Sequence, residues 1–286
     1  MSNNIKVVAV VGAGAMGKQI AMLSALGGCR TFLYDHEEES LIKARKTLYD
    51  LMNGSVRKGR LTENEKEQAF GRMEWTLDFN KAIKNSDLVI EAITENLELK
   101  QRVFTDMDAI APVDTIFATN SSTIINSKLA SVTNRPDKVL NMHFFFPPLV
   151  MNCIEVVKNK ETSNDTVTRV LEFSEKIERE AIVLEKEIHG FVANRILFSI
   201  YKEAIFLYEN GFADFKDIDI IVKKALGHQL GPFETMDLSG IDVTYYANKE
   251  FYNETKEEAN KPSHLLKEKF INNELGRKTG QGWYKY

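Results

Sequence analysis

The sequence predicts an α/β protein in which a mostly parallel sheet domain precedes an all-helical domain. Two observations support this. In the first half of the chain, short apolar runs alternate with longer amphipathic stretches, which is typical of right-handed βαβ units. After about residue 187 the strand signals fade and helical patterns follow. We therefore expect a sheet domain over residues 1–187 and a helical domain over residues 188–286.

The predicted sheet domain holds six strands and four helices. The strands are expected over residues 6–11, 31–34, 88–92, 115–119, 139–145 and 153–157, and the helices over 16–26, 38–52, 63–69 and 97–109. The basic run 57–60 is expected to form a turn between two helices.

The last two predicted strands are separated by a short link that contains Pro147 and Pro148. A parallel crossover needs about a dozen residues or more, so these strands pair antiparallel if they pair. A hairpin centred on Leu149 would place residue 143 opposite residue 155.

Four helices are expected in the second domain, over residues 191–209, 214–226, 238–250 and 264–275. Asn210 and Gly211 stop the first of them. Asp214 is suited to begin the second and Gly227 to end it, and Gly276 ends the last.

Composition and charge exclude several classes of protein. Of 286 residues, 43% are hydrophobic and 27% charged, as in ordinary globular proteins. Lys and Arg number 37 against 41 Asp and Glu, a balance that excludes a broad basic face for nucleic acid. No apolar run reaches the roughly 18 residues of a membrane span, and the start lacks signal-peptide features, so we expect a cytoplasmic protein without a membrane partner. Cys29 and Cys153 lack metal-type spacing, which predicts reduced cysteines and no metal.

A glycine motif predicts a dinucleotide site. Residues Gly12, Ala13, Gly14, Ala15, Met16 and Gly17 form a G-x-G-x-x-G that follows an apolar strand and opens a helix. Gly12 permits the tight turn, Gly14 lets the backbone approach the pyrophosphate, and Gly17 allows close helix packing. The helix N-terminus offers N–H groups to the phosphates. The alternative is a strand–turn–helix with glycines and no ligand.

An acidic residue after the second predicted strand selects the cofactor. Asp35 can accept hydrogen bonds from both ribose hydroxyls, whereas a 2′-phosphate would meet its carboxylate, with Glu37 and Glu38 close behind. The sequence therefore favours NAD over NADP.

Two groups of polar residues are candidates for the chemistry. Asn120, Ser121 and Ser122 follow a strand directly, where ligands bind in open α/β sheets, although Ser and Asn also suit a helix N-cap. His143 lies in an apolar strand, where a lone histidine is more often part of the core. Glu155, beside it in the predicted hairpin, could fix its tautomer and stabilise the imidazolium, leaving the other nitrogen to act as a base. Otherwise Glu155 is an ordinary strand-edge charge.

These residues and three further motifs resemble L-3-hydroxyacyl-CoA dehydrogenases. The motifs run from His189 to Arg195, from Gly231 to Glu234 and from Gly276 to Tyr284. The similarity covers nearly the whole chain in the family's order. The length matches the short stand-alone form, known as 3-hydroxybutyryl-CoA dehydrogenase.

The resemblance implies roles for individual residues. His143 would take the proton of the substrate's 3-hydroxyl, Glu155 would orient His143, and Ser122 would hydrogen-bond the substrate oxygen near the nicotinamide. Asn194 would position His143 or the substrate. The resemblance also implies contacts to NAD from Glu95, Lys100, Asn120, Ser122 and Lys278, to CoA from Lys58 and Ser122, and a homodimer through the helical domain. Apolar side chains such as Ile196, Ile200 and Leu207 agree with a dimer.

Two departures from the family pattern leave alternatives open. Phe146 stands where the family usually has Asn, and His189 where it usually has Pro. The first removes a polar contact near the nicotinamide, and the second could reshape the link to the second domain. The alternatives are an NAD-dependent dehydrogenase of a non-CoA 3-hydroxy acid and a non-catalytic NAD-binding protein.

Overall fold

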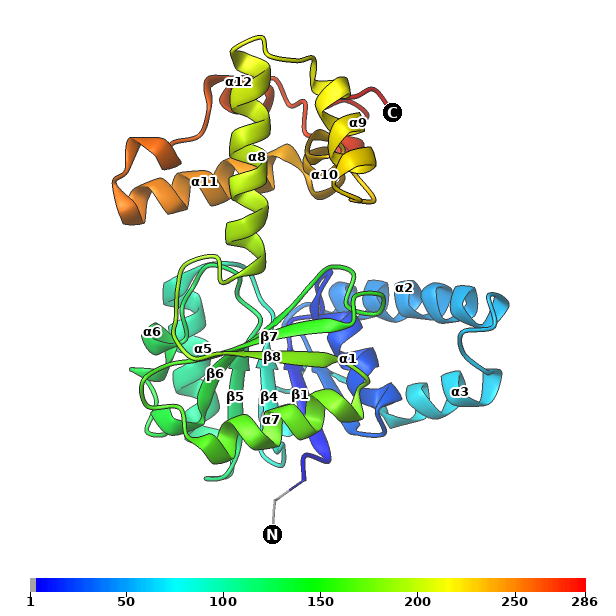
Figure 1. Cartoon of the computed structure of the whole chain (residues 1–286). Coiled ribbons are helices and arrows are strands. Elements are labelled where there is room, and N and C mark those ends of the chain that lie inside the picture. The colour runs from blue at the N-terminus through cyan, green and yellow to red at the C-terminus, as the bar shows by residue number, and fades with distance from the viewer. Residues whose placement is uncertain (1–3) are drawn as a thin grey trace. The chain divides into compact units, whose positions relative to one another are not determined.

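The computed structural model describes residues 4–286 and divides into two compact units, with the division between Phe191 and Val192 (Figure 1). The first unit is built on one eight-stranded sheet in the order β3-β2-β1-β4-β5-β6-β7-β8. Its strands are β1 (Val7–Val11), β2 (Arg30–Tyr34), β3 (Met73–Thr76), β4 (Leu88–Glu91), β5 (Ile116–Thr119), β6 (Val139–Phe144), β7 (Cys153–Lys158) and β8 (Glu180–Leu184).

The strands pair in parallel except for β6 and β7, which are antiparallel. His143 pairs directly with Glu155, so the predicted hairpin and its register are confirmed. In the parallel part, Val11 of β1 pairs with Glu91 of β4, and Glu91 pairs with Thr119 of β5. The carboxyl ends of these three strands therefore lie side by side, and open α/β sheets bind their ligands just beyond such strand ends.

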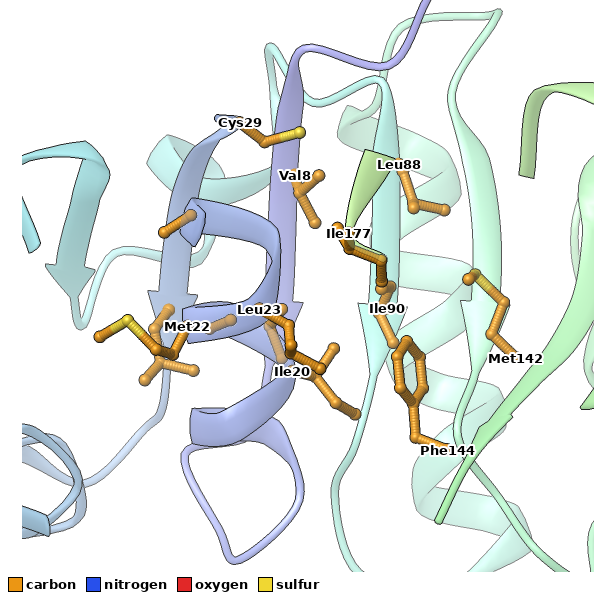
Figure 2. Packing of buried hydrophobic residues seen from close by; sticks show 14 of the residues in the cluster. Val8, Ile20, Met22, Leu23, Cys29, Leu88, Ile90, Met142, Phe144 and Ile177 are labelled. Atoms are coloured by element: carbon orange, nitrogen blue, oxygen red, sulfur yellow. The ribbon is translucent and has the colours of Figure 1, made fainter. Parts of the chain in front are cut away.

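Helices cover both faces of this sheet, as alternate strand residues require. On one face, α1 (Gly17–Leu26), α2 (Glu38–Arg57) and α7 (Asn164–Lys176) pack on side chains such as Val8 and Ile90. Figure 2 shows Ile20 and Leu23 of α1 packed against this face. On the other face, α4 (Phe79–Ile83), α5 (Leu97–Ile110) and α6 (Ser127–Ala130) pack on side chains such as Ala9 and Phe117.

The expected strands and helices of the first unit are present, with shifted ends and several additions. Helix α2 extends to Arg57, and the basic turn links it to α3 (Glu63–Arg72), as predicted. The elements β3, β8, α4, α6 and α7 and the short helix η1 (Pro136–Lys138) were not predicted from the sequence. Helix α7 carries a signal that could have revealed it, because Ser163 caps its N-terminus by accepting from the Thr166 N–H.

The second unit consists of α8 (Ala193–Glu209), α9 (Phe215–Ala225), α10 (Pro232–Ser239), α11 (Ile241–Thr255), η2 (Glu258–Asn260), α12 (His264–Ile271) and η3 (Arg277–Thr279). The expectation of a single helix over residues 238–250 was wrong. Gly240 adopts φ +105° and separates α10 from α11, a conformation that side chains other than glycine rarely adopt.

Two buried carboxylates account for the glycine and aromatic motifs of this unit. Asp237 accepts hydrogen bonds from the backbone of Trp283 and Tyr284 at 2.9 and 2.8 Å. A Cβ on Gly282 would lie 2.1 Å from an Asp237 oxygen, so only glycine fits there. Asp219 accepts from the Phe233 N–H and the Tyr284 hydroxyl, at 2.9 and 2.8 Å. These residues therefore hold the C-terminal segment against α9 and α10.

Within residues 4–286, no helix is long and apolar enough to cross a membrane, and no group of His, Cys, Asp and Glu is arranged to hold a metal ion. Cys29 and Cys153 form no disulfide. Burial raises the pKa of the Cys29 thiol, which disfavours the reactive thiolate.

Candidate active site

The glycine turn between β1 and α1 has the shape of a phosphate cradle. Gly12 adopts φ +107°, and a Cβ there would lie 2.7 Å from the Ala92 carbonyl oxygen. A Cβ on Gly17 would lie 1.9 Å from the Gly12 oxygen, so this glycine is needed for the helix to pack on the turn. A Cβ on Gly14 would meet nothing within 4 Å. Gly14 therefore borders open space, as a backbone does where a ligand approaches closely.

The hydrogen-bonding groups of this turn fit a dinucleotide. In the described part of the chain, the backbone N–H groups of Gly14, Ala15 and Met16 donate to no protein atom. They lie at the N-terminus of α1, where the helix dipole favours an anion. Asp35 is oriented by the Ala13 N–H at 2.8 Å and by the Glu37 N–H at 3.1 Å. Its carboxylate thus lies beside the turn, where the ribose of a dinucleotide would follow the phosphates.

A network of buried charged and polar side chains lies at the carboxyl ends of β4 and β5. Glu91, fully buried, binds Lys100 Nζ at 2.6 Å through Oε1 and the Thr119 hydroxyl at 2.7 Å through Oε2. Lys100 also reaches Glu95 Oε2 at 3.3 Å. Because Lys100 is only 1% exposed, its ammonium is oriented toward protein carboxylates.

Glu95 joins this network to the loop after β5. Its carboxylate accepts from the Ser121 hydroxyl and from the Thr123 hydroxyl and N–H. Burial alone would raise the pKa of Glu95, but Lys100 and these hydrogen bonds outweigh burial and lower it. Glu95 is therefore held as a carboxylate. Sequence reasoning missed Glu91, although a charged residue that ends an apolar strand is a usable signal.

His143 lies between a carboxylate and a hydroxyl. Its Nδ1 is 2.8 Å from Glu155 Oε2, and its Nε2 is 3.0 Å from Ser122 Oγ. Since an ionised carboxylate only accepts, Nδ1 carries the proton and Nε2 of the neutral ring accepts from Ser122. His143 and Glu155 are each 4% exposed. The rings of Phe145 and Phe191 flank the imidazole, with centroids 4.8 and 5.4 Å away.

The other predicted residues have these positions. Asn120 is buried and accepts from the Phe144 N–H at 2.9 Å, which ties the end of β5 to β6. Lys58 is exposed just after α2, and Phe146 is 64% exposed three residues beyond His143. In the second unit, Asn194 lies in the first turn of α8, and Lys278 forms an ion pair with Asp242.

The arrangement suits one type of reaction. A histidine held by a carboxylate can take a proton from an alcohol, and the neighbouring glycine turn can bind the dinucleotide that accepts the accompanying hydride. Such a site on a doubly wound sheet is that of an NAD-dependent dehydrogenase.

Comparisons with known proteins identify the family. The model of the 3-hydroxyacyl-CoA dehydrogenase NAD-binding domain matches residues 7–188, and that of the family's C-terminal domain matches residues 190–286. The chain belongs to the 3-hydroxyacyl-CoA dehydrogenase family, and its reaction is the NAD-dependent oxidation of a 3-hydroxyacyl-CoA. The predictions of the family, the fold class and NAD are thereby confirmed.

Individual relatives cover the whole chain. The human mitochondrial hydroxyacyl-coenzyme A dehydrogenase is 35% identical over 99% of this chain and 91% of its own length. A 3-hydroxybutyryl-CoA dehydrogenase of Mycobacterium tuberculosis is 33% identical over the full length of both chains. The crystal structure of (S)-3-hydroxybutyryl-CoA dehydrogenase from Ralstonia eutropha superimposes with a TM-score of 0.94, at 34% identity and 99% coverage of each chain.

Proposed function

We propose that the chain oxidises short-chain L-3-hydroxyacyl-CoA, such as 3-hydroxybutyryl-CoA, with His143 as the acid–base group. The observation that carries this proposal is the placement of the imidazole, with Nδ1 on Glu155 and Nε2 on Ser122. The names of the full-length bacterial relatives support the short acyl chain.

In the proposed mechanism, the substrate's 3-hydroxyl replaces or joins Ser122 at Nε2 of His143. The O–H bond breaks and its proton moves to Nε2, while the electron pair forms the C3 carbonyl. NAD, which the glycine turn and Asp35 would hold, would supply the acceptor for the hydride that leaves C3, so that the alcohol would be oxidised and NAD reduced. Glu155 stabilises the imidazolium by charge, and Ser122 hydrogen-bonds the substrate oxygen. In reverse, the protonated His143 acts as the acid.

Other residues receive roles from the family resemblance. We propose that Asn194 positions His143 or the substrate and that Lys58 meets the CoA. For NAD we propose contacts from the glycine turn, Asp35, Glu95, Asn120, Ser122 and Lys278, with Lys100 acting through Glu95.

The CoA requirement separates this proposal from the dehydrogenase of a free 3-hydroxy acid. We expect NADH formation from 3-hydroxybutyryl-CoA and little from 3-hydroxybutyrate, because the free acid lacks the CoA contacts. Steady-state rates measured at 340 nm over a series of acyl lengths, with NAD and NADP in parallel, check this. Equal kcat/KM for the thioester and the acid would contradict it. Tight NADH binding without turnover of any thioester would instead favour a non-catalytic NAD-binding protein.

Replacing Glu155 with Gln tests the carboxylate. The amide keeps the shape but cannot stabilise the imidazolium by charge, so we expect kcat to fall about 10- to 10³-fold. The acidic limb of the pH profile for oxidation should move to lower pH, because the ring protonates less readily. Glu180→Gln, at an exposed position of β8, is the matched control and should change neither quantity. An unchanged pH profile in Glu155→Gln would count against the pairing.

We also propose a homodimer through the helical unit. An open apolar groove of about 830 Å³ between α8 and α9 is lined by side chains such as Ile196, Ile221 and Leu226, which are 59%, 56% and 67% exposed. Exposed apolar side chains that gather in one groove are typical of an interaction surface. Size-exclusion chromatography with light scattering should show twice the 32.6 kDa of the chain. Ile221→Asp should shift the protein toward the monomer, whereas Ile42→Asp on α2, 64% exposed in the parent, should not. A parent protein of 32.6 kDa would refute the dimer.

A further inference from the structure

Three buried asparagines form a continuous chain of amide hydrogen bonds that ends on the turn over residues 121–124. Asn126 and Asn141 are 0% exposed and Asn159 is 7% exposed. They come from the N-cap position of α6, from β6 and from the residue after β7. None of them belongs to the residues to which the family resemblance gave a role.

We call Asn126, Asn141 and Asn159 the asparagine relay. Each of their side-chain NH2 groups donates two hydrogen bonds. Asn159 Nδ2 donates to the Asn126 side-chain oxygen at 2.6 Å and to the Val139 carbonyl at 3.1 Å. Asn126 Nδ2 donates to the Asn141 side-chain oxygen at 2.8 Å and to the Val157 carbonyl at 3.0 Å. Because the oxygen and the NH2 group of each amide have different partners, turning an amide over would lose its hydrogen bonds. Each amide therefore has a single favourable orientation.

The relay ends on the turn that carries Ser122. Asn141 Nδ2 donates to the carbonyl oxygens of Ser121 and Ile124, both at 3.3 Å. A single amide thus holds the turn on both sides of Ser122. Asn141 lies two residues before His143 on β6, so both side chains project from the same face of the strand.

The geometry points to Asn141 as a positioning residue: its amide holds the turn over residues 121–124 against the strand that carries His143, and thereby sets the Ser122–His143 hydrogen bond. Asn126 and Asn159 fix the orientation of that amide. The glycine turn lies outside these contacts. Loss of Asn141 is therefore expected to lower kcat more than it weakens the binding of NAD. This inference rests on the proposed roles of His143 and Ser122.

Asn141→Leu tests the inference, because leucine has a similar shape but no hydrogen-bonding group. We expect kcat to fall on the order of 10- to 100-fold, the cost of a small misplacement in an active site. KM for NAD should rise by a smaller factor than kcat falls, because the glycine turn and Asp35 make no hydrogen bond to the relay and only the contacts at Ser122 and Glu95 are disturbed. The acidic limb of the pH profile for oxidation should move to higher pH, because Ser122 no longer donates to the neutral ring.

A double-mutant cycle with Ser122→Ala separates positioning from a general structural role. If Asn141 acts through Ser122, the double variant should lose no more kcat than Ser122→Ala alone. Phe173→Leu, a truncation of a fully buried side chain on α7, is the stability control and should keep kcat and the pH profile at a comparable loss of Tm. Additive losses in the cycle, or a parent-like kcat and pH profile in Asn141→Leu, would overturn the inference.

Two further variants keep the outcome clear. If Asn141→Leu does not fold, Asn126→Ala breaks the relay one residue away from the turn and should lower kcat in the same direction by a smaller factor. A parent-like kcat and pH profile in Asn126→Ala would then reject the inference. His143→Ala separates the two proposals. Normal turnover in that variant would refute the proposed role of His143 as the base, whereas an inactive His143→Ala beside a parent-like Asn141→Leu would refute only the inference about Asn141.

Discussion

Replacing His143 with Ala should lower kcat about 10²- to 10⁴-fold, the usual contribution of a positioned acid–base group. The imidazole is the group within hydrogen-bond distance of both Glu155 and Ser122, so its loss leaves the substrate hydroxyl without a base at that position. Binding of NADH, measured by fluorescence titration, should stay within about threefold, because the glycine turn and Asp35 are unaffected.

His264→Ala provides the matched control for this substitution. His264 begins α12 and its side chain is 88% exposed, so its loss should leave turnover and NADH binding unchanged. Near-normal turnover of His143→Ala with 3-hydroxybutyryl-CoA would refute the assignment of the base. Loss of NADH binding together with activity would indicate instead that His143 holds the fold of the site.

Gly14→Ala should weaken NADH binding about 10- to 100-fold without unfolding the protein. A Cβ at this position meets no protein atom within 4 Å, so the substitution adds no clash within the chain. The methyl group would occupy the space that the pyrophosphate needs for close approach to the backbone. Fluorescence titration gives the Kd for NADH, and thermal unfolding without ligand checks that Tm is retained.

Substitutions at two other glycines serve as controls for Gly14→Ala. Gly71→Ala, in α3, also adds a Cβ with nothing within 4 Å, but it lies in a helix outside the turn and should leave Kd unchanged. Gly17→Ala should lower Tm strongly, since its Cβ would lie 1.9 Å from a backbone oxygen. A parent-like Kd in Gly14→Ala would show that the phosphates do not approach this turn.

The sequence predicted the parts of the fold that strong local signals encode. The β6–β7 hairpin followed from a link too short for a parallel crossover, and its register followed from the centre at Leu149. Strands β3 and β8 lie at the two edges of the sheet and escaped prediction. The four residues of β3 include Glu74 and carry no apolar run, whereas β8 has an apolar run over residues 181–184 that could have revealed it. The break at Gly240 escaped because a glycine within a helical pattern does not reveal a positive φ.

The candidate site was predictable where it depends on register and motif. His143 and Glu155 are brought together by strand pairing, and Ser122 by its position after β5. The tertiary partners were not predictable. Lys100 matched a cofactor-binding position, but its pairing with Glu91 depends on the packing of α5 against β4. The asparagine relay joins residues up to 33 positions apart, which no local pattern encodes.

The antiparallel pairing of β6 and β7 places the proposed acid–base pair in one short stretch of the chain, apart from the glycine turn. The proposed proton transfer depends on one hairpin, whose histidine and glutamate are 12 residues apart and close a short loop. The glycine turn and Asp35, which we propose to bind the phosphates and the ribose of the dinucleotide, lie far upstream, between β1 and α1 and directly after β2. Substitutions that change the nucleotide preference near Asp35 therefore leave the imidazole–carboxylate pair intact, so an ancestor of this enzyme could exchange one cofactor for another and keep its base.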